Sequence, residues 1–173
     1  MSLSEERLWK FRKPDWINNT AARSLGVYGA GAMFSLAFFL ILDAAVWSHS
    51  HKNGSTIHVN FTDWVPFMFS SLGMLIINSI EKTRLSADSF SYSGSGVALK
   101  ARVVLFLGFA SLAGGLAGGI TVLVLKYVMG EAVWPTIYMG IANVLSSTFV
   151  MLSSIMLWVS QNIDDEYSYS LAL

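Results

Sequence analysis

Four apolar runs dominate the chain, and each is close to the length of a membrane-spanning helix. They cover residues 25–47, 64–80, 103–125 and 137–159. A helix of about 20 apolar residues crosses the roughly 30 Å hydrocarbon core of a bilayer. Polar and turn-forming residues collect between the runs, so the pattern predicts helices separated by loops. We therefore expect an all-α polytopic membrane protein: a four-transmembrane-helix bundle that occupies residues 25–159.

Small and polar residues recur at helical spacing inside these runs. Lipid removes the hydrophobic drive between helices, so small residues and polar side chains hold a bundle together. The predicted packing stripes are Gly26, Ala30, Met33, Ala37, Leu40, Ala44 and Trp47 in the first run, Ser71, Met74, Asn78 and Glu81 in the second, and Gly140, Asn143, Ser147, Met151, Ser154 and Trp158 in the fourth. The first stripe alternates steps of four and three, a heptad spacing that favours left-handed packing at a shallow angle.

The third run carries the strongest packing signal, two overlapped GxxxG pairs. They consist of Gly114, Gly115, Gly118 and Gly119. This motif lets helix backbones approach closely. The sequence leaves three interpretations open: close packing inside the chain's own bundle, a flexible or gating point, or a docking surface for another subunit.

Composition narrows the class of protein. The chain is 54% hydrophobic and 13% charged, against about 25% charged residues in a soluble domain. Its net charge is zero and it has no cysteine. These values exclude a bulk attraction to nucleic acid, disulfide bonds and thiolate metal sites.

Basic residues predict the orientation in the membrane. Nine of the 11 lysines and arginines lie before the first run or around the second loop, and the other two are Lys52 and Lys126. The positive-inside rule then places both termini and the 81–102 loop in the cytosol. We expect residues 1–24 to form a basic, aromatic interfacial segment, residues 86–96 a linker and residues 160–173 an acidic cytosolic tail.

Four polar residues stand out within or at the ends of the spans: Asp43, Asn78, Glu81 and Arg102. A carboxylate inside the bilayer is costly, which makes Asp43 a candidate for proton coupling. The alternative is a helix-end carboxylate that reaches water or a hydroxyl group. Asn78, like Asn143, is expected to bond across the bundle, and Glu81 and Arg102 are expected to pair at the cytosolic surface.

The first loop supplies the remaining candidate chemistry. It holds His49, His51 and His58 ahead of Asp63, but their spacing matches no standard zinc site, so we predict no metal and no cofactor. A pH-sensing role is a minor alternative. Two N-glycosylation sequons begin at Asn53 and Asn60, where we expect low occupancy because the loop is short. We find no catalytic motif and predict no catalytic residue.

Several blocks of the chain resemble the transmembrane protein 50 (UPF0220) family of small four-span proteins, including its fungal members. The blocks are LDA at 42–44, DWVPF at 63–67, SLGMLIINSIEK at 71–82, ARVVLFLGFA at 101–110, LAGGL at 112–116 and QNIDDEYSYSL at 161–171. The resemblance implies a role in late endosome-to-vacuole protein sorting, at endosome and vacuole membranes. It also implies a complex with a second small four-span protein similar to the leptin-receptor-overlapping-transcript family. It supplies no catalytic residues.

Three functional classes follow from these observations. The leading one is a non-enzymatic membrane subunit of a trafficking complex that associates through its helices. The second is a small proton- or ion-coupled transporter or channel that uses Asp43, and the third is a membrane enzyme that uses the loop histidines.

Overall fold

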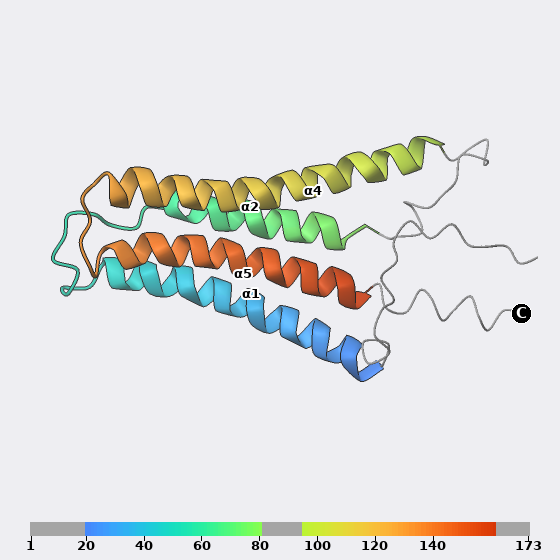
Figure 1. Cartoon of the computed structure of the whole chain (residues 1–173), viewed down its shortest axis with the longest axis horizontal. Helices are drawn as coiled ribbons and strands as arrows, with labels where there is room; N and C mark the ends of the chain where they lie inside the picture. Colours follow the sequence, from blue (N-terminus) through green and yellow to red (C-terminus); the bar gives the residue numbers. More distant parts are fainter. Residues whose placement is uncertain (1–19, 81–94, 162–173) are drawn as a thin grey trace, which may run out of the picture.

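The computed structural model describes residues 20–80 and 95–161, and every regular element in these ranges is helical. The elements are α1 (Thr20–Ser48), α2 (Phe61–Asn78), α4 (Ser95–Val122), its continuation as the π-helix η2 (Leu123–Val128), and α5 (Ile137–Gln161). The helices run side by side in one bundle (Figure 1). We call the end that carries segments 49–60 and 129–136 the loop end, and the opposite end, where α1 begins and α5 ends, the terminal end.

Within the described residues, the apolar runs located every long helix but underestimated its length. α1 begins at residue 20 and α4 at residue 95, ahead of the predicted 25 and 103. Residues 95–96 therefore belong to a helix instead of the predicted linker, and residues 20–24 and 160–161 are helical too. The length of an apolar run corresponds to the thickness of the hydrocarbon core of the bilayer. Backbone hydrogen bonds can continue a helix beyond that core, so the helix is longer than its apolar run. The predictions for residues 1–19, Glu81 and residues 162–173 lie outside the described residues.

Three of the helices are long and apolar enough to cross a membrane, over Arg23–Ser48, Leu99–Val128 and Ile137–Gln161. α2 is not among them. It has 18 residues, and its buried positions include Asp63 and Ser70, which lower its mean hydropathy. α2 nevertheless lies alongside the other helices (Figure 1).

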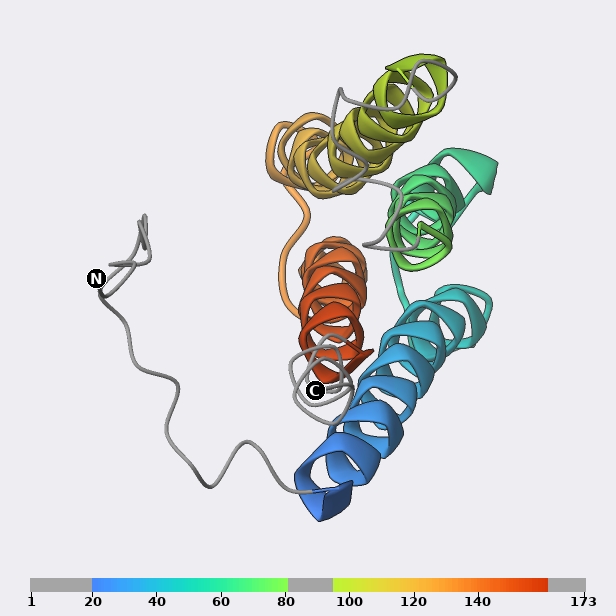
Figure 2. The ribbon, with the colours of Figure 1, turned by 90° about the vertical axis from the view of Figure 1, so that its right-hand side faces the viewer.

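The helices pack mainly as two antiparallel pairs, α1 with α5 and α2 with α4, and α2 also contacts α5 (Figure 2). Between α1 and α5, Ser146 and Ser153 each donate a 2.7 Å hydrogen bond to a backbone oxygen of α1, at Ala37 and Ala30. Ser160, seven residues further, lies against Gly26. In the predicted stripe of α1, Gly26, Ala30, Ala37 and Ala44 are buried and the other three residues are half-buried, so the stripe lies on the face of α1 that packs into the bundle.

Between α2 and α4, glycines set the separation. A Cβ atom on Gly73 would lie 2.7 Å from both the Gly108 oxygen and the Leu112 nitrogen, and one on Gly108 would lie 2.7 Å from the Ile77 side chain. Such distances leave no space for a methyl group, so the two backbones are in direct contact. The most deeply buried face of α2 is consequently Ser70, Gly73 and Ile77. The predicted stripe of Ser71, Met74 and Asn78 is only half-buried.

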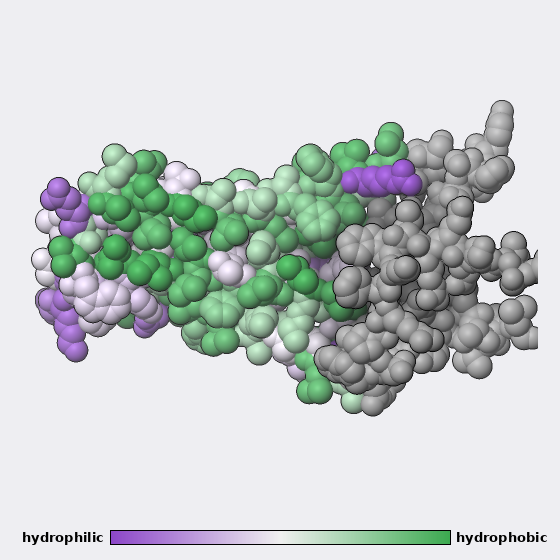
Figure 3. All heavy atoms as spheres, in the orientation of Figure 1, coloured by the Kyte–Doolittle hydropathy of each residue, from purple (hydrophilic) through white to green (hydrophobic). Residues whose placement is uncertain are grey.

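Large apolar side chains cover the outside of the bundle. Leu36, Phe39, Phe69 and Phe106 are each more than half exposed. Figure 3 shows this apolar surface along the helices, with hydrophilic residues at the loop end and again near the start of α4. An outward-facing apolar surface of this kind suits contact with lipid tails.

Candidate functional site

The loop end of the bundle encloses a charged and hydrogen-bonded network centred on Asp63. Asp63 is 1% exposed. Its Oδ2 atom forms an ion pair with the Lys126 ammonium group and accepts a 2.7 Å hydrogen bond from the Asn60 backbone N–H. Its Oδ1 atom accepts a 3.1 Å bond from the Tyr127 hydroxyl group. Both oxygens of a buried carboxylate are thus satisfied, which its burial requires.

The local sequence explains how each of these groups arrives there. Asn60 has an extended backbone and forms the N-cap of α2. Asp63 lies three residues later in the first turn, where the exposed N–H groups of a helix favour a carboxylate. The network also includes α5, because Asn143 of α5 donates a 2.9 Å hydrogen bond to the Asp63 backbone oxygen.

The π-helix η2 brings two consecutive residues to the same carboxylate. Its wider turn is seen in the bond from the Met129 N–H to the Val124 oxygen, five residues back, at 2.9 Å. Short π-helical segments often occur at functional sites. Here the segment presents Lys126 and Tyr127 to Asp63, and the Tyr127 ring packs against Gly140, whose missing side chain leaves room for it.

The first loop is fastened to the network and to the end of α1. Lys126 donates a second hydrogen bond to the His58 backbone oxygen at 2.7 Å. The Ser48 hydroxyl accepts a 2.7 Å bond from the Val59 N–H, and the Ser48 carbonyl oxygen lies 2.9 Å from His58 Nδ1. The rings of His49 and His58 stack with their centroids 6.0 Å apart.

Asn53 joins the two loop segments. Its amide nitrogen donates to the backbone oxygens of Ser48 and Ile57, and its amide oxygen accepts from Thr136. Asn53 is 5% exposed. The sequon that begins at Asn53 therefore offers an amide that is already used inside the fold, whereas Asn60 of the other sequon is exposed.

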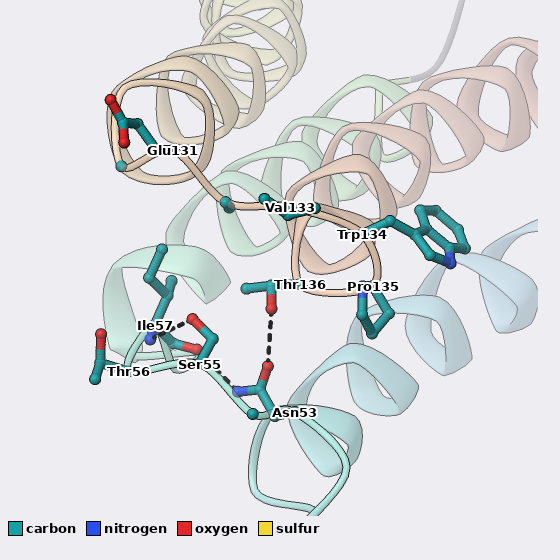
Figure 4. Close-up of a pocket in the computed structure, with 12 residues that line it drawn as sticks. Asn53, Ser55, Thr56, Ile57, Glu131, Val133, Trp134, Pro135 and Thr136 are labelled. Atoms are coloured by element: carbon teal, nitrogen blue, oxygen red, sulfur yellow. Dashed lines mark hydrogen bonds between the residues drawn. The ribbon is translucent and has the colours of Figure 1, made fainter.

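An open hollow of about 470 Å³ lies between these loop segments, lined by residues 53–57 and 130–136. Figure 4 shows Asn53 and Thr136 bonded across it, with Glu131 and Trp134 projecting on opposite sides. No charged side chain points into its centre in this view. The hollow thus separates the loops without gathering reactive groups.

Asp43 occupies a different place, at the outer edge between α1 and α5. It is exposed, and its Oδ2 atom accepts a 2.8 Å hydrogen bond from the Tyr138 hydroxyl group. This arrangement matches the alternative in which the carboxylate reaches a hydroxyl group near the helix end. Asp43 does not lie on the buried face that a path between the helices would need.

The two asparagines of the predicted set bridge helices inside the bundle. Asn143 bonds to α2 as described above, and Asn78 donates to Met74 of its own helix and, at 3.3 Å, to Ser154 of α5. Ser147 is fully buried next to Gly119. Arg102 is exposed on the first turns of α4. Its predicted partner, Glu81, lies outside the described residues.

The four glycines of α4 divide between the inside and the outside of the bundle. A Cβ atom on Gly115 would lie 2.7 Å from the Pro66 oxygen of α2. Gly119 faces α5, where a Cβ atom would lie 3.5 Å from Val144, and a Cβ atom on Gly118 would lie at ordinary contact distance from Pro66. These three glycines pack within the chain, which favours close packing in its own bundle among the three interpretations of the motif. A Cβ atom on Gly114 would meet nothing within 4 Å.

Sequence reasoning missed three features of this region. The Asp63–Lys126 pair could have been suspected, because it joins opposite charges at the same end of two predicted spans. The seven-residue repeat Ser146, Ser153 and Ser160 was also readable. The isolated Gly73 and Gly108 carried no signal until the pairing of α2 with α4 was known.

The contacts of this site join several helices and a loop and hold them in place. The ion pair connects the start of α2, the end of η2 and the first loop, and Asn143 adds α5. Each polar atom of Asp63 is occupied by a neighbour in the chain. In the described part of the chain, no three histidine, aspartate or glutamate side chains come together as a metal site requires.

Three known proteins are similar to this chain over most of its length. The chain is 47% identical to vacuolar protein sorting-associated protein 68 of Saccharomyces cerevisiae, over 87% of this chain and 88% of the relative. It is 44% identical to a UPF0220 protein of Schizosaccharomyces pombe over the full length of both. It is 29% identical to a transmembrane protein 50 homolog of Dictyostelium discoideum, over 80% of this chain and 90% of the relative.

No solved structure matches the chain. Residues 4–167 match the family model described as "Uncharacterised protein family (UPF0220)". This match covers nearly the whole chain and agrees with the resemblance found in its sequence blocks. The chain belongs to the UPF0220 family.

Proposed function

We propose that this protein is a non-enzymatic membrane subunit of an endosomal complex that acts in late endosome-to-vacuole protein sorting. The observation that carries the proposal is the 47% identity to a vacuolar protein sorting-associated protein over 87% of the chain. The tightly bonded loop end supports it, because the polar groups there hold helices together instead of forming a reactive centre. The compartment would be the endosome and vacuole membrane.

The proposed topology has four spans with both termini in the cytosol. α1 begins and α5 ends at the same end of the bundle (Figure 1). Lys100 and Arg102, at the start of α4, lie at this end as well. The positive-inside rule assigns that end to the cytosol. α2 crosses with the others because its charged residue, Asp63, and Ser70 are buried against its neighbours instead of facing lipid.

The proposed mechanism is helix–helix association with a second small four-span protein similar to the leptin-receptor-overlapping-transcript family. Small residues on the outer face of α4 support this surface. Ala110, Gly114, Ala117 and Thr121 are exposed and recur every three or four residues. They allow another helix to approach closely in lipid. Gly115 and Gly119 are excluded from the surface because they already contact α2 and α5.

Co-purification in mild detergent tests the proposal. A stoichiometric second four-span protein should accompany the wild-type chain, and Gly114→Leu should reduce its amount without lowering the thermal midpoint of the chain. Gly31→Leu is the matched control, since Gly31 also has open space around it but lies on α1. Gly115→Leu should instead destabilise the chain itself.

Two results would contradict the proposal. One is a wild-type chain that purifies alone as a homo-oligomer, and the other is full co-purification by Gly114→Leu. Reconstituted ion flux that Asp43→Asn abolishes would favour the transporter alternative. The exposed position of Asp43 at the edge of the bundle speaks against that alternative.

A further inference from the structure

A small apolar groove opens on the side of the bundle in its terminal half, far from the Asp63 network. Its volume is about 100 Å³. Residues from three helices line it: Ile77 of α2, Phe109 and Leu112 of α4, and Ser154, Ile155 and Trp158 of α5. Ile77 and Leu112 are buried, whereas Ile155 is 52% exposed. The groove therefore has a closed floor and an outer edge that faces the surroundings of the bundle.

The groove exists because α4 and α5 separate toward the terminal end. α4 contacts α5 at Gly119, where an added Cβ atom would lie 3.5 Å from the Cα atom of Val144. From there α4 runs away from α5, as Figures 1 and 2 both show. The α2 helix, held to α4 by Gly73 and Gly108, fills the gap only in part and supplies the floor.

A positive charge lies between the groove and the terminal end, on the same side of α4 as the groove. Arg102 precedes Phe109 by seven residues, which is two helical turns and about 10 Å along the axis. Arg102 is exposed. Lys100, two residues earlier, is exposed as well but falls on nearly the opposite side of the helix, because each residue turns the chain by about 100°.

We propose that this groove binds one acyl chain of an anionic glycerophospholipid whose phosphate group lies against Arg102. The groove is too small for a helix, which is about 10–12 Å wide with its side chains. A water molecule occupies about 30 Å³ of liquid. A groove of about 100 Å³ therefore accommodates only a few groups of the size of a methylene. The distance from the groove to Arg102 corresponds to the upper part of an acyl chain and the headgroup.

The charge argues for an anionic headgroup. An arginine guanidinium binds phosphate oxygens through two parallel hydrogen bonds, and it keeps its charge at any physiological pH. Anionic lipids are concentrated in the cytosolic leaflet, which is the leaflet that the proposed topology assigns to the terminal end. Trp158, at the mouth of the groove, is a residue type enriched at membrane interfaces.

Lipid retention after reconstitution tests this site. The full-length chain, with any partner that accompanies it, is placed in vesicles of phosphatidylcholine and phosphatidylserine with identical acyl chains. It is then extracted in mild detergent, and the retained lipids are quantified by mass spectrometry. The wild-type chain should retain phosphatidylserine in excess of its share in the vesicle. Arg102→Gln should lower that excess about fivefold, the factor that corresponds to about 1 kcal/mol per basic residue at an anionic surface.

Matched variants separate charge from shape. Lys100→Gln removes an equal charge on the other side of α4 and should leave the excess unchanged. Ile155→Trp should fill the groove and reduce retention of both lipids, whereas Leu145→Trp, an exposed position of α5 outside the groove, should not. Thermal midpoints check that each variant is folded.

Three outcomes would overturn the proposal. The first is wild-type retention of the two lipids in their vesicle ratio, a result that depends on no variant. The second is an equal loss in Lys100→Gln and Arg102→Gln. The third is that a stoichiometric polypeptide, and not phospholipid, accompanies the wild-type chain and is lost from Ile155→Trp. That result would show that the groove binds a partner protein.

Discussion

The loop end and the middle of the bundle are held together by different kinds of contact. At the loop end, a buried carboxylate, an ammonium group, a phenol and several backbone groups form directional bonds around Asp63. In the middle, the helices meet through glycines between α2 and α4 and through single serine hydroxyls between α1 and α5. An ion pair lies at one end of the bundle, whereas its middle packs small residues and neutral polar groups together with large apolar side chains such as Ile41, Phe67 and Val150.

This difference follows from the free-energy cost of placing a polar or charged group at each depth of the bilayer. A charge near the bilayer centre is costly and becomes cheaper toward the interface, so an ion pair fits at a helix end. At mid-bundle, close van der Waals packing and modest hydrogen bonds are the contacts available. We infer that the loop end sets which helices are neighbours, and that the middle sets how closely they approach.

Breaking the ion pair should have the largest effect. Lys126→Met leaves the Asp63 carboxylate buried without its cation, and removing one partner of a buried pair costs about 3–5 kcal/mol. Because the Lys126 side chain is 24% exposed, we expect a loss near the lower end of that range. The free energy of unfolding in detergent, followed by circular dichroism, measures it.

Two further variants sharpen this result. Lys52→Met removes an exposed lysine of the first loop and should leave stability unchanged. Adding Asp63→Asn to Lys126→Met should restore part of the loss, since no buried charge is then left unpaired. If Lys126→Met unfolds at the wild-type midpoint, the loop end does not hold the bundle together as we describe.

Filling a glycine contact should have an intermediate effect. The new methyl group of Gly73→Ala would lie 2.7 Å from two backbone atoms of α4, which cannot rotate away, so the helices must separate. Overpacking of this kind costs about 1–3 kcal/mol. Gly31→Ala, which meets nothing within 4 Å, is the control and should not lose stability. Equal stability of the two variants would argue against direct backbone contact between α2 and α4.

Removing one serine hydroxyl should have the smallest effect. Ser153→Ala deletes the 2.7 Å bond to the Ala30 oxygen, and interhelical hydrogen bonds in membranes average about 0.6 kcal/mol. The matched control is Ser35→Ala, because the Ser35 hydroxyl bonds only to Gly31 of its own helix among the bonds described here. A loss from Ser153→Ala as large as that from Gly73→Ala would remove the distinction between the two interfaces.

The sequence by itself determined the helices and the faces of some of them. Apolar runs locate the helices α1, α2, α4 and α5 because hydropathy is a local property that needs no knowledge of neighbours. The heptad stripe of α1 identified its buried face for the same reason. The more polar α2 run was also found, even though α2, with 18 residues, is not among the helices that are long and apolar enough to cross a membrane.

Only the tertiary structure decided which residues meet. Gly114 and Gly115 are neighbours in one motif, yet one faces outward and the other touches α2, because consecutive residues on a helix point about 100° apart. Asp63 and Lys126 form a pair although 63 positions separate them. Sequence patterns describe each helix alone, whereas the choice of neighbours, the ion pair and the lateral groove depend on how the helices are placed against one another.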